Sequence, residues 1–439
     1  MDIIEFLRQF ETDNCTCKRA HKLVVQDVII EKNAIKRLPE LISKYNSKKP
    51  FLLADKNTFS ACGKKVLSVL EKANIKYSSY VFASGLVAPN EQSVGSAIMH
   101  FDKSCDLIIG VGSGVINDLG KILASTTKLP YFIVGTAPSM DGYASETSSM
   151  AMDGVKVSLP SKCANVIIGD IDILKNAPMK MLQAGLGDML AKFISIAEWR
   201  IASEITGEYY CEKVAELIRG AVRRCVDNAK GLLERDEQAI KAVFEGLVIG
   251  GVAMAFAGVS RPASGVEHYF SHVWDMRCLE FNTKEELHGL QCAVATNIVS
   301  GLYEKMLKLK PNRESALEYV RSFDYKSWAN SLRKYLGKSA ETMILLEQKE
   351  RKYDREKHAE RLDIIIEKWN KVCQIISEEI PPKKDIEKIL DIIGAPKTVE
   401  ELGIECDLFL TLKATKDIRD KYVLSRLLWD LGIIDNFIL

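Results

Sequence analysis

Two histidines in the segment SRPASGVEHYFSHVWD, residues 260–275, have the spacing of a chelating pair. Ser264 is followed three residues later by Glu267, which matches a capping box and predicts a helix starting at this point. On that helix His268 and His272 share one face, where an ordinary solvated face would carry Lys and Glu. The opposite face carries a core-type stripe: Val266, Tyr269, Phe270, Val273 and Trp274. We therefore predict a functional site on this helix.

An acidic residue and a third histidine complete a candidate metal site. Taken singly, Asp188 could be the dipole partner of a helix start and His288 a core histidine. Together, one carboxylate and two imidazoles leave open positions on a divalent ion, as a catalytic metal requires. Asp188 and His268 would supply two of the ligands. The third would be either His272 or His288, and spacing alone does not choose between them.

A glycine-rich turn, GVGSGVINDLGK at 110–121, follows a predicted strand and opens a predicted helix. Gly110, Gly112 and Gly114 would let backbone amides approach an anion, and the helix N-terminus adds its positive dipole end. The GxGxxG spacing of the Rossmann fingerprint is absent, and so is the Lys-Ser/Thr ending of a Walker A motif. We predict a phosphate-binding loop, with a tight turn that holds no ligand as the structural alternative.

Two more loops follow predicted parallel strands, at the edge where open α/β sheets bind ligands. Asp55 ends the strand FLLAD and could accept a hydrogen bond from an adenosine ribose 2′-hydroxyl, which would favour NADH over NADPH. An Asp after a strand is, however, more often a turn residue. The loop GTAPSMDGYAS at 135–145 gathers four polar side chains: Thr136, Ser139, Asp141 and Ser145.

The order of the predicted elements divides the chain in two. Five predicted strands alternate with helices: 21–30, 51–58, 77–82, 105–114 and 129–138. This alternation predicts a parallel sheet covered on both faces, and 156–170 adds two strands read as a hairpin beside it. Beyond about residue 175 the periodicity is helical, including one long charged helix over 340–378. We predict an α/β nucleotide-binding domain over 1–178 and an all-α domain over 179–439.

Composition and charge give no support for several classes of function. The 439 residues exceed the usual size of one domain, and a formal net charge of +1 gives no support for a nucleic-acid or membrane-surface partner. The start, MDIIEFLRQFETD, lacks the features of a signal peptide, and no apolar run approaches the ~20 residues of a membrane span. Eleven scattered cysteines suit reduced thiols, so a cytoplasmic location is expected. The CxC of Cys15 and Cys17 is interpreted as incidental rather than as a metal site.

Five motifs in order resemble the glycerol-1-phosphate dehydrogenase family, part of the iron-containing alcohol dehydrogenase and dehydroquinate synthase superfamily. They are GVGSGVINDLGK, GTAPSMDGYAS, GLGDMLAK, SRPASGVEHYFSH and HG, and the match runs over about residues 20–300. SRPASG is the most specific of them, because glycerol dehydrogenases resemble the metal pattern but not this segment. The chain beyond about residue 305 matches only in being helical.

The resemblance implies a role for each candidate residue. Asp188, His268 and His288 would bind zinc or nickel, His272 and Asp141 would contact substrate, and His272 and Asp188 would be the catalytic residues. Ser113 stands where the family often has a glycine, and its flanking glycines are kept, so we expect binding to survive. NADH or NADPH would contact eight residues: Gly112, Ser113, Gly114, Val115, Ile116, Thr136, Ser139 and Ser145.

The activity that the resemblance implies is reversible reduction of dihydroxyacetone phosphate to sn-glycerol 1-phosphate by NADH or NADPH, for glycerophospholipid-type synthesis, with the active site in the cleft between the domains. The substrate phosphate needs an anion pocket, for which Arg261, Lys192 and the helix start after Ser264 are candidates. A structural ion pair is the alternative for Arg261.

Two rival functions are kept. One is a glycerol or polyol dehydrogenase, or a dehydroquinate-synthase-like lyase, of the same superfamily. The other is a non-catalytic nucleotide-binding or assembly protein, which the full set of proposed ligands argues against. A homodimer is compatible with each of these functions, and residue chemistry alone does not predict the oligomeric state.

Overall fold

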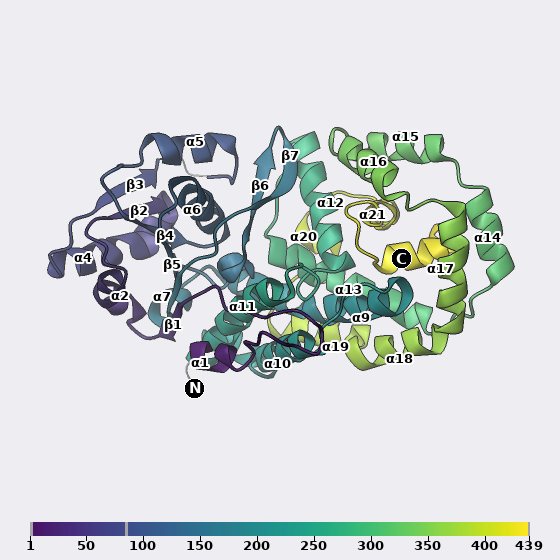
Figure 1. Ribbon diagram of the computed structural model, residues 1–439, viewed down its shortest axis with the longest axis horizontal. Helices are drawn as coiled ribbons and strands as arrows, with labels where there is room; N and C mark the ends of the chain where they lie inside the picture. Colours follow the sequence, from purple (N-terminus) through teal and green to yellow (C-terminus); the bar gives the residue numbers. More distant parts are fainter. Residues whose placement is uncertain (1–2, 84–86, 438–439) are drawn as a thin grey trace. The chain divides into compact units, whose positions relative to one another are not determined.

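The computed structural model describes residues 3–83 and 87–437 (Figure 1). Its contacts group the chain into two compact units. Unit 1 runs to Asp153 and resumes over Val157–Met189 and Glu216–Val259, while unit 2 holds Gly154–Lys156, Leu190–Ala215 and the chain from Ser260 on. The single boundary at residues 178–179 stays a prediction. Helix α11 (Glu237–Ala257) follows that point in sequence but packs in unit 1.

Six parallel strands form the sheet of unit 1 (Figure 1). In spatial order they are β1 (Asp27–Glu31), β8 (Val166–Asp170), β5 (Tyr131–Gly135), β4 (Leu107–Gly112), β2 (Pro50–Asp55) and β3 (Ser78–Phe82). The central strands β4, β5 and β8 are buried at every position, as the strands of a parallel sheet covered on both faces must be. This confirms the predicted α/β class.

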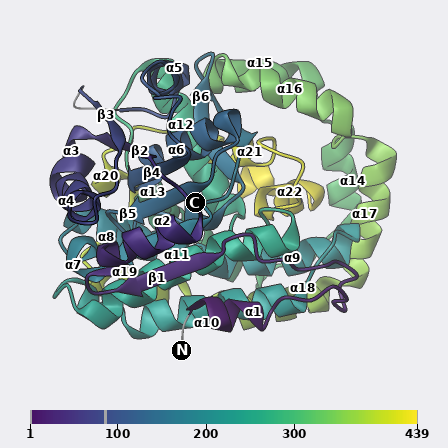
Figure 2. The same cartoon turned by 60° about the vertical axis from the view of Figure 1, so that its left-hand side comes forward.

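Helices cover the two faces of this sheet with different side chains. On one face, α2 (Leu38–Lys44) and α4 (Lys64–Lys72) join a core cluster with alternate strand residues such as Leu52 and Ile109. On the other face, α6 (Gly114–Thr127) packs along β4, and Phe244 of α11 fills the space beside strand glycines. Helices α1 (Ile3–Arg8) and α11 lie against the edge strand β1 (Figure 2).

The predicted hairpin over 156–170 is wrong. Strand β7 (Val155–Pro160) pairs with β6 (Thr147–Met152), which was not predicted, in a separate two-stranded sheet, and β8 enters the main sheet between β1 and β5. The turn between β6 and β7 is Asp153-Gly154, with φ of 53° and 76°. Asp-Gly with positive φ at both positions is the type I′ signal for a two-residue hairpin, and it identifies the pairing that the weak apolar pattern of TSSMAM hides.

Unit 2 is helical, as predicted. Its centre is formed by α9 (Lys192–Thr206), α12 (Val266–Phe281) and α13 (His288–Met306), which contact one another. Further helices follow in green to yellow in Figure 1: α14 (Arg313–Arg321), α15 (Tyr325–Leu336), α16 (Ser339–Glu350), α17 (Arg355–Glu367), α18 (Trp369–Glu379), α19 (Lys383–Ile392), α20 (Val399–Leu402), α21 (Leu408–Thr415) and α22 (Leu424–Asp430). The predicted single helix over 340–378 is wrong, because it is divided into α16, α17 and α18.

The division between α16 and α17 has a local cause. Arg351 adopts a left-handed conformation (φ 51°) after the last turn of α16, which ends the helix. Asp354 then caps α17, because its side chain accepts hydrogen bonds from the backbone N–H groups of Glu356 and Lys357. In the sequence, charged residues recur at helical spacing throughout this stretch, so neither the end of α16 at Arg351 nor the cap at Asp354 is apparent.

Helix α11 is long and apolar enough to cross a membrane, which was not expected from the sequence. It is the one such helix in the described part of the chain, and 78% of its most apolar window is buried inside the protein. That burial is what a core helix of unit 1 requires, and its small residues allow a loop of the candidate site to approach closely.

Candidate functional site

Three loops leave the carboxyl edge of the sheet at neighbouring strands. Gly112 at the end of β4 pairs with Gly135 at the end of β5, and Ala54 of β2 pairs with Val111. The chain moves from β2 outward to β3 but from β4 to β5 on the opposite side, so the boundary between β2 and β4 is a topological switch point. Ligands of open α/β sheets bind at such a point. The predicted nucleotide loops therefore converge in unit 1.

The glycine-rich turn directs the amides at the start of α6 outward from the strand. A Cβ on Gly112 would lie 2.5 Å from the Cβ of Ile116, so only glycine allows this approach. Ser113 caps α6 without a side-chain hydrogen bond, and its carbonyl accepts the Asn117 N–H at 2.9 Å. Gly114 begins the 14-residue helix, whose N-terminal amides and dipole suit an anion. Val115 lies partly exposed in the same turn.

Asp55 has a structural role as a helix cap, in line with the turn residue that the sequence analysis kept as the alternative to a ribose contact. Its Oδ1 accepts the N–H groups of Asn57 and Thr58, at 2.8 and 2.9 Å, and caps the short helix α3 (Lys56–Thr58). The Thr58 hydroxyl in turn accepts the Asp55 N–H at 3.1 Å, which completes a capping box. The contact to a ribose hydroxyl stays a prediction.

Lys121 is a residue of the nucleotide motif that the sequence interpretation missed. Its side chain is buried, and its Nζ lies 3.0 Å from a carboxylate oxygen of Asp118. The Nζ also donates to the carbonyl of Gly142 at 3.2 Å, to the Ser145 hydroxyl at 3.1 Å and to the carbonyl of Thr147. A buried lysine with this many acceptors fixes the loop at residues 142–147. The i,i+3 spacing of Asp118 and Lys121 in NDLGK was the sequence signal that could have identified this lysine.

The loop after β5 is held against α8 (Met179–Leu190). A Cβ on Gly185 of that helix would lie 1.8 Å from the carbonyl oxygen of Pro138, so the contact requires glycine. Beyond it, the backbone N–H of Asp141 donates to Oδ2 of Asp188 at 2.9 Å. The two predicted carboxylate residues are therefore neighbours. Thr136, Ser139 and Ser145 are buried in the same loop, and the contacts they would make to a cofactor stay predictions.

Asp188 lies near the C-terminal end of α8 and not at the start of a helix, which corrects the sequence prediction. The side chain is fully buried. A carboxylate in the last turn of a helix faces the negative end of the helix dipole, so dipole stabilisation does not explain it. Its position instead favours a cationic ligand, as the metal hypothesis requires.

The start of α12 differs from the predicted capping box. The helix begins at Val266 after Gly265, and no side chain caps it in the usual way. Glu267 Oε1 accepts the Gly265 N–H at 2.8 Å, and Glu198 of α9 supplies its Oε2 to the Val266 N–H at 2.8 Å. An acceptor 68 residues away thus replaces Ser264. The predicted core stripe is confirmed, because all five of its side chains are buried.

His268 and His288 lie side by side, and each has one ring nitrogen held by an acceptor. Their ring centroids are 5.1 Å apart. The Nδ1 of His268 lies 2.8 Å from Glu267 Oε1, and because that oxygen also accepts the Gly265 N–H, Nδ1 is the donor. A carboxylate at Nδ1 leaves Nε2 for a metal, which is the usual partner arrangement of a ligating histidine. This supports the metal role of His268 in chemical terms.

A hydrogen-bond relay orients His288 in the same way. Its Nδ1 lies 2.7 Å from the hydroxyl of Ser271, which donates its own proton to Gln291 Oε1 at 2.6 Å. The Gln291 amide donates to Asp275 at 3.0 Å, which fixes its orientation. Ser271 must therefore accept the Nδ1–H of His288, which puts the lone pair of the ring on Nε2. Both imidazoles are thus oriented with Nε2 as the nitrogen that can bind a metal.

His272 occupies a different position on α12. Its ring is stacked at 6.1 Å from that of His288, and it is half-buried. Burial, together with the nearby Arg419 and His288, holds the pKa of His272 well below its ordinary value. The imidazole is therefore neutral near pH 7 and can exchange hydrogen bonds with a substrate.

Cys292 is a second residue that the sequence interpretation missed. It lies one turn after His288 on α13, with its Sγ 3.6 Å from Nε2 of that histidine. With His268 the two form a group whose potential ligand atoms all lie within 4.8 Å of one another. Burial raises the pKa of Cys292, but His268 and His288 outweigh it and leave the pKa below its ordinary value. The H-x3-C spacing was the signal for this thiol.

Arg261 forms a structural ion pair, the alternative kept for it, and its contact with a substrate phosphate stays a prediction. It is buried, its Nε donates to Glu208 Oε1 at 2.6 Å and its Nη2 to the other oxygen of the same carboxylate. Nη1 donates to the carbonyl of Tyr422 at 2.9 Å. Lys192, the other predicted cation, is buried as the first residue of α9.

Lys421 is a missed cation beside the SRPASG segment. Its Nζ donates to the carbonyl of Ser264 at 3.0 Å and lies over the Tyr269 ring. Burial lowers the pKa of Lys421 to about 7, and Arg261 and Arg419 add to the effect. Its position, far along the chain in a region without a motif, gave the sequence analysis no signal.

Comparison with known proteins shows the family of the chain. The family model for iron-containing alcohol dehydrogenase matches residues 29–178. A glycerol-1-phosphate dehydrogenase [NAD(P)+] from Halalkalibacterium halodurans is 32% identical over 301 residues, which cover 67% of this chain and 75% of the relative. The enzyme of that name from Methanosarcina acetivorans is 30% identical, covering 63% and 76%. The chain belongs to the glycerol-1-phosphate dehydrogenase family. This family is NAD(P)-dependent and metal-containing.

Solved structures show the same fold at low sequence identity. Glycerol dehydrogenase from Schizosaccharomyces pombe aligns with a TM-score of 0.59 at 17% identity, covering 94% of this chain and 89% of that one. Maleylacetate reductase from Agrobacterium tumefaciens aligns with a TM-score of 0.61 at 11% identity, covering 95% and 96%. The helical region beyond residue 300, which carries no family motif, is therefore part of the shared fold.

Proposed function

We propose that this protein is a metal-dependent, NAD(P)H-linked oxidoreductase that interconverts dihydroxyacetone phosphate and sn-glycerol 1-phosphate. The observation that carries the proposal is the pair His268 and His288, each with Nδ1 held by an acceptor, so that Nε2 is the nitrogen with a lone pair for a metal. Curated relatives that carry this activity in their names support the choice of substrate.

The proposed metal ligands are Asp188, His268 and His288, and the ion is zinc or nickel. The residues fit such an ion, because zinc sites combine imidazole nitrogens with a carboxylate oxygen, and three such ligands leave a coordination position open. When bound there, the ion would act as a Lewis acid on the ketone oxygen. The Cys292 thiol, 3.6 Å from His288 Nε2, adds a soft donor beside this set.

The other residues position the reactants. The amides at Gly112–Ile116 would bind the pyrophosphate of NADH or NADPH, which supplies the hydride. Neutral His272 would hydrogen-bond the substrate hydroxyl and pass a proton between that oxygen and water. Asp141, whose backbone contacts Asp188, would contact a hydroxyl of the substrate. NADH is the cofactor that Asp55 favours.

A cation is still needed for the substrate phosphate. Since the guanidinium of Arg261 is already paired with Glu208, we assign this role to Lys192 and Lys421. The lowered pKa of Lys421 near 7 means that an approaching phosphate dianion would favour its charged form. We also propose a cytoplasmic location, which eleven cysteines outside any disulfide support, and a homodimer, to be tested by light scattering.

One assay tests the proposal. The purified protein is supplied with zinc or nickel, dihydroxyacetone phosphate and NADH or NADPH, and cofactor oxidation is followed by absorbance with chiral analysis of the product. We expect consumption of the cofactor and sn-glycerol 1-phosphate as product. Formation of sn-glycerol 3-phosphate, or turnover of unphosphorylated dihydroxyacetone alone, would contradict it. A lyase would show no net cofactor consumption.

A further inference from the structure

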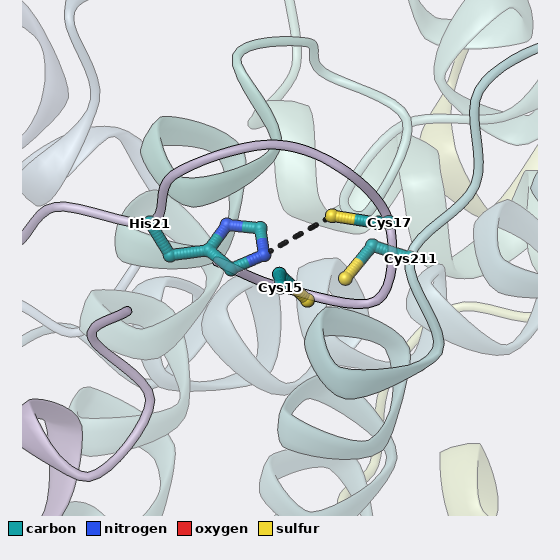
Figure 3. Close-up of side chains that lie close together, drawn as sticks. All are labelled: Cys15, Cys17, His21 and Cys211. Atoms are coloured by element: carbon teal, nitrogen blue, oxygen red, sulfur yellow. Dashed lines mark hydrogen bonds between the residues drawn. The ribbon is translucent and has the colours of Figure 1, made fainter. Parts of the chain in front are cut away.

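A second group of potential metal ligands lies outside the proposed active site. The side chains of Cys15, Cys17, His21 and Cys211 point toward one another (Figure 3). Their ligand atoms, three thiol sulfurs and one imidazole nitrogen, all lie within 4.8 Å of one another. The sequence interpretation of the CxC as incidental considered neither the nearby histidine nor the distant cysteine. No part of the proposed reaction uses these residues.

His21 is oriented as a metal ligand would be. The side chain is buried, and its Nδ1 lies 2.8 Å from the carbonyl oxygen of Phe256 near the end of α11. Because a carbonyl oxygen only accepts, Nδ1 is the donor and Nε2 carries the lone pair. That Nε2 lies 3.4 Å from the Sγ of Cys17. The structure therefore presents Nε2 to the thiols.

The segment that carries three of the ligands is closed on itself. Thr12 and His21 exchange two backbone hydrogen bonds, at 3.1 and 2.7 Å, so residues 12–21 form a loop with both cysteines inside it. A turn from Cys15 to Lys18, with Lys18 at φ 65°, directs the two thiols to the same side. Arg19 fastens the loop by donating to the Ala257 carbonyl at 2.8 Å.

The fourth ligand comes from the start of α10 (Glu212–Asp227). Cys211 directly precedes the helix and is buried, and its carbonyl accepts the Ala215 N–H at 3.0 Å. This hydrogen bond makes Cys211 part of the first turn of α10, so its place is set by that helix. The positive end of the helix dipole also interacts favourably with a metal-bound thiolate.

We propose that Cys15, Cys17, His21 and Cys211 bind a structural zinc ion. Three cysteines and one histidine are one of the ligand sets of closed tetrahedral zinc sites. Zn–S bonds of about 2.3 Å imply sulfurs roughly 3.8 Å apart, so the group needs only small side-chain movements to close on an ion. All four positions are filled by protein, which leaves no open position for substrate and assigns the ion a structural role. Lys18 and Arg19 offset the charge of three thiolates.

The position of the cluster explains why an ion would be needed. Residues 9–26, between α1 and β1, contain no helix or strand of their own, and most of the side chains at 11–20 are exposed. A segment of that length without a core has little to offset its conformational entropy. Metal binding supplies that free energy, because the ligands are brought together only in the folded chain. The zinc would hold the segment on the ends of α10 and α11.

Metal content of the full-length protein tests the proposal. Mass spectrometry of metals in the wild type should find two ions per chain, at least one of them zinc. The double variant Cys15→Ser/Cys17→Ser should lose one equivalent of zinc, show a lower Tm and keep turnover with dihydroxyacetone phosphate. Cys373→Ser/Cys406→Ser, which removes two other partly exposed thiols, is the matched control and should keep both ions.

Zinc X-ray absorption of a second variant, His268→Ala, tests the proposal even if the double variant does not fold. His268→Ala should retain only the proposed structural ion, and its zinc X-ray absorption should show three sulfurs at about 2.3 Å and one nitrogen at about 2.0–2.1 Å. Unchanged zinc in Cys15→Ser/Cys17→Ser, a zinc shell without sulfur, iron in place of zinc, or a disulfide between Cys15 and Cys17 in the isolated protein would overturn the proposal. None of these readings depends on whether the enzyme reduces dihydroxyacetone phosphate.

Discussion

The two units prepare for their ligands by different means. At the carboxyl edge of the sheet in unit 1, the predicted ligand contacts would come from the backbone, and close packing there requires positions without a side chain, as at Gly112 and Gly185. On α12 and α13 of unit 2, the contacts come from side chains whose orientation is set by other side chains, as Glu267 and Ser271 set the two imidazoles.

The two kinds of site should respond differently to substitution. A site built from backbone groups tolerates few substitutions, because a new Cβ either fits or overlaps a neighbouring atom. Substitutions there should therefore act through steric overlap. A site built from hydrogen-bonded side chains is graded, because each further partner removed costs part of the affinity for the ligand. Substitutions in the two regions should therefore differ both in size and in which ligand they affect.

The largest effect is expected from His268→Ala in unit 2. Removing a metal ligand should abolish stoichiometric binding at the catalytic site and lower kcat/KM at least about 1,000-fold, roughly 4 kcal/mol of transition-state stabilisation. The KM for NADH should change little, because the nucleotide loops are in unit 1. Steady-state kinetics and metal analysis measure both, with the exposed His100→Ala as control. Full activity in metal-depleted His268→Ala would refute the metal role.

Glu267→Gln tests whether the side-chain network tunes the metal. The variant keeps an acceptor oxygen but loses the negative charge beside His268 Nδ1, so metal affinity should fall roughly 10–100-fold. Competition with a chelator measures this affinity, and excess metal should restore most of kcat. The exposed Glu360→Gln is the control for lost charge. Equal metal affinities in Glu267→Gln and the wild type would show that the network only supports the fold.

Gly112→Ala tests the backbone-built site. Its Cβ would lie 2.5 Å from the Cβ of Ile116, so the turn must shift, at a cost of about 1–3 kcal/mol in stability, and the KM for NAD(P)H should rise about tenfold. Metal binding should be unchanged. Gly220→Ala in α10, where no described atom lies within 4 Å of the new Cβ, is the control and should be neutral or stabilising. Parallel behaviour of the two variants would contradict the steric argument.

How much of this arrangement can be predicted from sequence follows from the range of the interactions. The strands β2, β4 and β5 and their loops were predictable, because continuous apolar runs and glycines are local signals. The start of α12 was not, because Glu198 replaces the expected Ser264 cap across 68 residues of sequence. The place of Asp188 in its helix was also missed, since the helix was expected to begin near residue 186, whereas α8 begins at Met179 and no side chain caps the start of α9.

The site residues divide along the same line. The histidines were identified from their spacing and from the family motifs, whereas the partners that orient them, such as Ser271 and Gln291, have no signal of their own. The group around His21 was missed for a related reason, because Cys211 is 190 residues from it in sequence. Pairings of this kind depend on tertiary packing, which residue periodicity does not record.

The smallest effect is expected from Lys421→Met, which tests the charge balance of the helical region. A lysine whose pKa is lowered to about 7 in the folded protein loses its proton between pH 7 and 10.5 while the unfolded chain keeps it. The unfolded state then binds more protons, so this group makes the protein more stable as pH rises, by about 1 kcal/mol between pH 7 and 8. Lys421→Met should remove that increment from urea unfolding curves, whereas the exposed Lys334→Met should retain it. Identical pH dependence in Lys421→Met and the wild type would mean that Lys421 stays charged, and would place it with the surface lysines rather than with the side-chain network of unit 2.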